Sequence, residues 1–175
     1  MKKNMKNLCL SAVCLALCMI LPFLTGQIPQ IGNALSPMHI SVLMCGLLCG
    51  WPYGLVVGFI APLLRFLLFG MPPIMPTGLA MMFELASYGA LSGLLCKVLP
   101  KKLPYLYVSL IGAMLGGRIV WGIVRFALGL IVGPAFTFSA FLSGAFIVAI
   151  PGIICHILLI PPIVIGVRRA LHSFE

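Results

Sequence analysis

Few residues of this chain could carry chemistry, because most charged side chains lie at the ends of long apolar runs. Within the runs lie one acidic residue, Glu84, and three basic residues, Arg65, Arg118 and Arg125. A charge in the middle of a bilayer costs at least about 2.5–3.5 kcal/mol, so each of the four needs a partner or a wet cavity. One carboxylate neutralises one guanidinium, which leaves positive charge unmatched. Guanidinium groups bind carboxylates through paired hydrogen bonds, so the set predicts a site for an anionic small molecule.

The depths of these residues along their runs are compatible with one shared site. At about 1.5 Å per helical residue, Glu84 is predicted about 10 Å below one end of its run and Arg65 about one turn below the same end of its own run, with His39 at similar depth. Arg118 and Arg125 are seven residues apart and therefore share a helical face. The alternative is an internal salt bridge that only braces helices, with Arg125 extending to the lipid headgroups. His156 is expected far from this group, in a hydrogen bond between helices.

Aromatic and amide side chains near these charges would complete a small-molecule site. Trp121 lies one helical turn beyond Arg118, and Tyr88 one turn beyond Glu84. Trp121 could instead belong to the aromatic belt at a membrane surface. The predicted substrate-binding residues are Gln30, Asn33, His39, Arg65, Glu84, Tyr88, Arg118 and Trp121.

Other reactive patterns are absent from the sequence. It has no GxxxxGK[ST] phosphate-binding loop, so we expect no ATP hydrolysis by this chain, and no HExxH zinc motif. The seven cysteines are odd in number and most lie in apolar runs, which argues against a disulfide framework. Pairs four residues apart, such as Cys14 and Cys18, have no histidine at zinc spacing, so we interpret them as packing residues. We predict no catalytic residue, metal or cofactor.

The composition requires that membrane helices position these residues. Of the 175 residues, 62% are hydrophobic and 7% are charged, and the mean hydropathy is +1.23. Soluble domains carry about 25% charged residues, so a soluble enzyme is excluded. The net charge of +9 could suggest nucleic-acid binding, but the basic residues form short clusters without a basic stripe interleaved with aromatics. We therefore expect no nucleic-acid partner and interpret the charge as a topology signal in a lipid bilayer.

The apolar runs predict an all-α membrane protein with one domain of six transmembrane helices. A crossing needs about 20 apolar residues, and turn residues such as those at 50–52 divide runs that are too long for one crossing. The last run is long enough to tilt or to kink at Pro151. The predicted spans are residues 8–24, 37–50, 52–69, 78–96, 103–131 and 139–167.

The distribution of basic residues predicts the orientation. Eight of the eleven lysines and arginines fall on one side of a six-span arrangement, and the segments 25–36, 70–77 and 132–138 on the other side carry none. Cytoplasmic segments are enriched in lysine and arginine, so both termini are predicted in the cytoplasm. The eight residues are Lys2, Lys3, Lys6, Lys97, Lys101, Lys102, Arg168 and Arg169.

Two stretches carry a resemblance to a known family. Ala12-Val-Cys-Leu-Ala16 in the first run has small residues four apart, and residues 37–73 include Cys45-Gly-Leu-Leu-Cys-Gly-Trp-Pro-Tyr-Gly54 and Pro62-Leu-Leu-Arg65. In these stretches, and in length and span number, the chain resembles the substrate-binding S-components of energy-coupling factor (ECF) vitamin transporters. The second stretch is similar to members labelled as predicted pantothenate carriers.

The resemblance implies a transport function in the bacterial cytoplasmic membrane. An S-component captures a vitamin-like substrate with high affinity, while a transmembrane coupling subunit and two cytoplasmic ATPase subunits drive the import. Ala12 and Ala16 would dock on the coupling subunit, and the segment that contains Gln30 and Asn33 would act as a lid. The substrate is expected to be anionic, with pantothenate favoured and folate, riboflavin or a queuosine-type base open. The alternative is a membrane enzyme or structural membrane protein whose arginine and glutamate cluster only braces the helices.

The resemblance also implies which residues line the substrate pocket. In the family, the fourth to sixth spans and the outer loops line this pocket. The matching positions among the candidates are Glu84, Tyr88, Arg118 and Trp121, whereas Arg65 is placed by charge reasoning alone.

Overall fold

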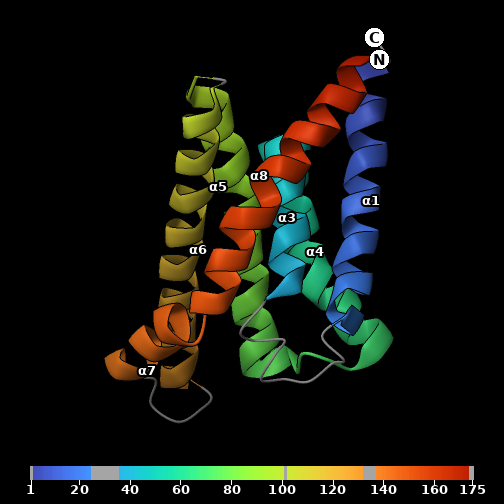
Figure 1. Ribbon diagram of the computed structural model, residues 1–175. Helices are drawn as coiled ribbons and strands as arrows, with labels where there is room; N and C mark the ends of the chain where they lie inside the picture. Colours follow the sequence, from blue (N-terminus) through green and yellow to red (C-terminus); the bar gives the residue numbers. More distant parts are fainter. Residues whose placement is uncertain (1, 25–35, 101, 132–136, 174–175) are drawn as a thin grey trace.

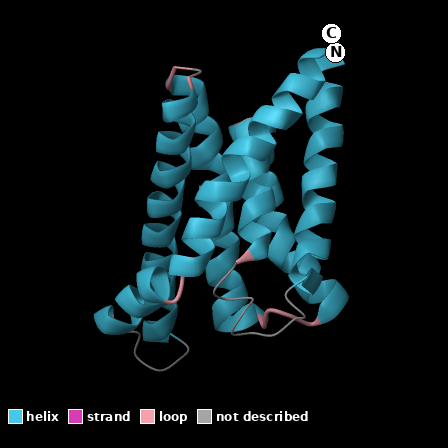
Figure 2. Ribbon diagram, viewed as in Figure 1, coloured by secondary structure: helices cyan, strands magenta, loops and turns pink. Residues whose placement is uncertain are grey.

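In the computed structural model, the described residues (2–24, 36–100, 102–131 and 137–173) form helices and short connections, with no strand among them (Figures 1 and 2). Five of the described helical stretches are long and apolar enough to cross a membrane, and a sixth apolar helix is shorter. The predicted all-α, six-helix membrane fold is confirmed. The elements are α1 (Lys2–Leu24), α3 (Pro37–Cys49), α4 (Trp51–Phe69), η1 (Ile74–Gly78), α5 (Leu79–Val98), α6 (Leu103–Ile131), α7 (Phe138–Leu142), η2 (Ser143–Ile147) and α8 (Ile150–Ser173).

The short helix α3 decides how deep its residues lie. Its 13 residues span only about 20 Å, less than the roughly 30 Å hydrocarbon core of a bilayer. Gly50 ends it with a positive φ of 96°, and Pro52 fits the first turn of α4, where no backbone donor is needed. The carbonyl groups left at the end of α3 accept hydrogen bonds from Asn7 Nδ2, to Cys49 O at 3.2 Å, and from Arg168 Nη2, to Leu47 O at 2.8 Å. Helix α3 therefore ends inside the protein.

Glycines bring α4 and α5 into backbone contact. A Cβ atom added to Gly54 would overlap the backbone at Gly89, and one added to Gly89 would overlap the backbone at Gly54. Gly58 meets the backbone of Leu85 in the same way, one residue from Glu84. The two helices cannot move closer without a backbone clash, and moving apart would break the contact. Helices α4 and α5 therefore hold Glu84 at a fixed place.

The described ends of α1 and α8 lie together at one end of the bundle, and the α5–α6 connection lies at that end too (Figure 1). The connection between α4 and α5, with η1, lies at the opposite end, as does α7 (Figure 1). The basic clusters at Lys97, Lys102 and Arg168 therefore share the end with the termini, as the charge pattern predicted. We call it the terminal end; its assignment to the cytoplasm stays a prediction.

Several boundaries differ from the predicted spans. The predicted run 139–167 is not one helix: α7 continues directly into η2, and a turn at 148–149, next to the kink expected at Pro151, separates η2 from α8. Proline is tolerated in the first turn of a helix, which explains why α8 begins at Ile150. Helix α1 begins at Lys2 rather than at residue 8, because lysines are good helix formers and extend an apolar helix beyond the membrane.

Candidate functional site

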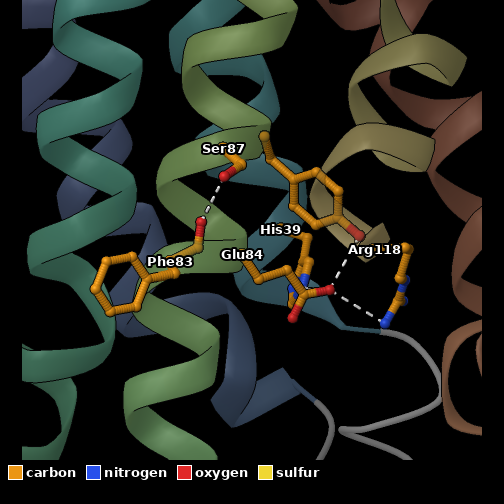
Figure 3. A network of polar contacts seen from close by, with 6 residues as sticks. His39, Phe83, Glu84, Ser87 and Arg118 are labelled. Carbon is orange, nitrogen blue, oxygen red and sulfur yellow. Dashed lines mark hydrogen bonds and ion pairs between the residues drawn. The ribbon is translucent and has the colours of Figure 1, made fainter. Parts of the chain in front are cut away.

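Three helices bring polar side chains together around the carboxylate of Glu84 (Figure 3). Glu84 lies on α5 and is only 2% exposed. Its Oε1 atom accepts a hydrogen bond from the hydroxyl of Tyr88 at 3.0 Å and lies 3.2 Å from Nη1 of Arg118 on α6. Nε2 of His39, on α3, is 3.6 Å from the same oxygen. We call these four residues the Glu84 cluster; the sequence predicted all four as substrate-binding residues.

Local sequence explains this convergence. Glu84 and Tyr88 are four residues apart, so they project from the same face of α5. Gly117 precedes Arg118 on α6, and a Cβ atom there would overlap the Tyr88 ring, so the glycine gives this ring its space. His39 lies in the first turn of α3, whose short length places that turn within the bundle. The Tyr88 and His39 rings pack edge to face, with centroids 5.2 Å apart.

The cluster has hydrogen-bonding capacity that the described protein does not use. Every contact of the Glu84 carboxylate given above goes to Oε1, and no described residue donates to Oε2. Arg118 uses Nη1, and its other guanidinium nitrogens form no hydrogen bond with a described residue. Nδ1 of His39 is buried and has no hydrogen-bond partner among the described residues. One acceptor and several donors of the cluster thus have no hydrogen-bond partner among the described residues.

Arg65 lies in a different environment, contrary to the expectation from depth that it shares one site with Glu84 and Arg118. Its Nη1 donates to the carbonyl oxygen of Met19 on α1 at 3.1 Å. Its guanidinium carbon lies 5.5 Å from the ring centroid of Phe23 and 5.3 Å from that of Phe69. We call these four residues the Arg65 corner. The expectation was wrong because position along a helix gives depth but not the direction in which a side chain points.

His156 lies beside the cluster, although the sequence placed it far away. Its ring stacks on His39 with centroids 6.2 Å apart and an interplanar angle of 15°, and it is 2% exposed. The prediction was wrong because it treated residues 37–50 as a full membrane crossing and placed His156 deeper in the bundle than His39. Since α3 is short, His39 lies deep enough to meet α8.

The remaining candidates lie at the edge of the cluster or outside the described residues. Trp121, one turn from Arg118, stacks on Phe141 of α7 with centroids 6.2 Å apart. It also faces Gly144, where a Cβ atom would approach its ring to 3.0 Å. Trp121 therefore joins α6 to the α7–η2 segment. Gln30 and Asn33 fall outside the described residues.

The small residues of α1 lie on an open face. Ala12 and Ala16 are exposed, whereas Cys14 and Cys18 of the same helix are buried. All seven cysteines are free, and Cys14 and Cys18 belong to the hydrophobic core, in agreement with the interpretation of these two as packing residues. Within the ranges that the structure describes, no group of histidine, cysteine, aspartate or glutamate residues could hold a metal ion.

Comparison with known proteins gives one match. A family model described as "ECF transporter, substrate-specific component" matches residues 6–164. No curated protein and no solved structure matches the chain.

Proposed function

We propose, from the premise that this chain belongs to the family of substrate-specific components of ECF transporters, that the Glu84 cluster binds the transported substrate. As a member of this family the chain is a multi-pass membrane protein and a transporter subunit, not an enzyme. The enzyme alternative is thereby excluded. The observation that carries the proposal is a buried ionic cluster whose Glu84 Oε2, His39 Nδ1 and remaining Arg118 nitrogens have no hydrogen-bond partner among the described residues.

The chemistry of the cluster favours a substrate with a carboxylate. The free edge of the Arg118 guanidinium can bind a carboxylate through two parallel hydrogen bonds. Glu84 Oε2 can accept a hydrogen bond from a hydroxyl or amide of the same molecule, and the imidazole of His39 can donate or accept one. Once a second anion shares the guanidinium of Arg118, Glu84 neutralises it only in part, and Arg65 adds positive charge in the same half of the bundle.

Pantothenate is the first substrate to test, because it combines one carboxylate with hydroxyl and amide groups and because the sequence resembles predicted pantothenate carriers. Folate also carries carboxylates, whereas riboflavin and queuosine-type bases would use the cluster differently. We infer a carboxylate-bearing micronutrient as the substrate class and pantothenate as its leading member.

Mass spectrometry of the small molecule that remains bound through purification tests the proposal. The wild-type protein and Arg65→Ala should both carry a molecule with a carboxylate, and folded Arg118→Ala should lose it. A neutral molecule, or equal retention by Arg118→Ala, would refute the carboxylate assignment. Bracing of helices would then be the role of the Glu84–Arg118 pair.

ECF substrate-specific components associate with an energy-coupling module, and we propose that Ala12 and Ala16 form the contact with its transmembrane coupling subunit. Both residues are exposed on α1 while the opposite side of the helix packs in the core. Small residues four apart let two membrane helices approach closely. The two ATPase subunits would bind to the coupling subunit on the cytoplasmic side.

A bulky residue on this face tests the docking proposal. Ala16→Trp should leave substrate binding to the isolated protein unchanged and abolish ATP-driven uptake in cells. Ile119→Trp is the matched control, since Ile119 on α6 is also exposed, at 57%, but lies on another helix. Uptake should persist in that variant. If Ala16→Trp weakens binding by the isolated protein as much as it reduces uptake, the face serves internal packing instead.

A further inference from the structure

A cavity lies at the terminal end, far along the bundle from Glu84. It has a volume of about 300 Å³ and is enclosed by the last turn of α5, the first turns of α6 and the last turns of α8. This volume is at the lower limit of small-ligand pockets. The residues that the argument uses are Lys102, Tyr105, Leu106, Ser109, Arg168 and Arg169.

The described residues of the cavity lining include three basic side chains and no acidic one. Lys102 and Arg169 form no ion pair with any described residue. Arg168 is held in place by neutral groups, because Nη2 donates to Leu47 O at 2.8 Å and lies 3.0 Å from Cys96 Sγ. Three positive charges therefore face one cavity without a described carboxylate to balance them. The N-terminus of α6 adds the positive end of a helix dipole.

The rest of the lining is suited to a lipid rather than to a free ion. Leu103, Leu106 and Ile165 make one part of the wall apolar, and Tyr105 offers a hydroxyl near the end of a membrane helix, where tyrosines favour lipid headgroups. Ser109 is buried and donates its hydroxyl to Tyr105 O at 2.9 Å. Basic pockets between membrane helices on the cytoplasmic side bind the phosphates of anionic lipids.

We propose that this cavity binds the phosphate headgroup of an anionic phospholipid from the leaflet at the terminal end. The basic side chains contact the phosphate, and the apolar wall receives the glycerol and the start of an acyl chain. Because Arg168 also bonds to the end of α3, a lipid bound there would stabilise the contact between α8 and α3. This site is independent of the substrate site, and neither proposal depends on the other.

Native mass spectrometry with added phosphatidylglycerol or phosphatidylcholine tests the proposal. The wild-type protein should retain phosphatidylglycerol in preference to phosphatidylcholine. Lys102→Gln/Arg169→Gln should bind phosphatidylglycerol about 10- to 30-fold more weakly, since each basic residue near an anionic membrane surface contributes a factor of about 5. The variant keeps Arg168, so the hydrogen bond to α3 is preserved.

Lys6→Gln/Lys97→Gln is the matched control, because it removes two charges from the same end and neither residue lines the cavity. It should bind phosphatidylglycerol within about threefold of wild type, a difference below 1 kcal/mol. Equal losses in both double variants would overturn the proposal in favour of general attraction between charges. Displacement of the lipid by an excess of inorganic phosphate would also overturn it, because the site would then bind the free ion.

If the cavity variant does not fold, Arg169→Gln alone is measured, with an expected weakening of about fivefold and Lys97→Gln as its control. Equal effects of these two single changes would likewise overturn the proposal.

Discussion

Two arginines with little exposure, one at the Arg65 corner and one in the Glu84 cluster, show how different surroundings give one side chain different roles. Arg65 is 6% exposed, and the Arg118 side chain is 12% exposed. Arg65 contacts a backbone carbonyl and two phenyl rings, which join α1 to α4. Arg118 contacts a carboxylate that also holds a tyrosine and a histidine, and these groups retain unused donors and acceptors. Burial of a charge is therefore not enough to identify a binding site; polar partners with free capacity are also needed.

The largest expected effect is on substrate affinity in Arg118→Ala. Loss of one partner of a desolvated charge pair costs about 2–5 kcal/mol, or about 30- to 4,000-fold in affinity. Titration calorimetry on the folded protein, with the molecule identified after purification, measures this change. Arg118→Lys should recover only part of the affinity, because an ammonium group lacks the planar fork of a guanidinium.

Arg65→Ala should reverse the pattern and reduce stability rather than affinity. Loss of a hydrogen bond from a charged group costs about 1.5–3 kcal/mol, and the contacts with Phe23 and Phe69 are lost as well. We expect a lower melting temperature in detergent, with substrate affinity within about threefold of wild type once the protein is folded. Arg65→Met, which keeps an apolar stem between the rings, should recover part of the stability. An affinity loss as large as that of Arg118→Ala would assign Arg65 to the substrate site.

Tyr88→Phe should have the smallest effect. It removes the hydroxyl that donates to Glu84 Oε1 but keeps the ring that packs on Gly117. A hydrogen bond to a charged group contributes about 1.5–3 kcal/mol to stability. Tyr88 acts on the substrate only through the position of Glu84, so we expect about half of this to reach substrate binding and affinity to fall about 2- to 12-fold. The same calorimetric titration measures it, and Tyr105→Phe, at the other end of the bundle, should leave affinity unchanged. If Tyr88→Phe also has no effect, Tyr88 does not help to orient the carboxylate.

The helices could be predicted from the sequence because each apolar run and each basic cluster is a local property. The composition of α4, α5 and α6 is enough to define them as membrane helices, and their predicted limits at 52–69, 78–96 and 103–131 differ from the observed ones by two residues at most. The division of the last run into α7, η2 and α8 was only partly predicted. Proline indicates where a helix can break but not how the two pieces are arranged.

Contacts among the candidate residues could be predicted where helical spacing was sufficient and were missed where the packing of distant helices decided them. Glu84 and Tyr88 share one face of a helix, so their contact follows from a spacing of four residues. The direction of Arg65 depends on how α4 is rotated against α1, which is set by glycine contacts between α4 and α5 far along the chain. The contact of His156 with His39 depends on how deep α3 lies. The prediction treated residues 37–50 as an ordinary membrane crossing, so it missed that the short α3 places His39 within reach of α8.

The most direct test of the account is a cycle between the substrate carboxylate and Arg118. Affinities of the identified substrate and of its uncharged amide are measured by calorimetry on wild type, Arg118→Ala and Arg65→Ala. If the carboxylate contacts Arg118, the amide should bind at least about 30-fold more weakly than the acid to wild type and to Arg65→Ala. The two forms should bind folded Arg118→Ala within about threefold of each other. If the amide binds Arg118→Ala as much more weakly than the acid as it does in wild type, the account is contradicted, because the carboxylate would then be recognised elsewhere.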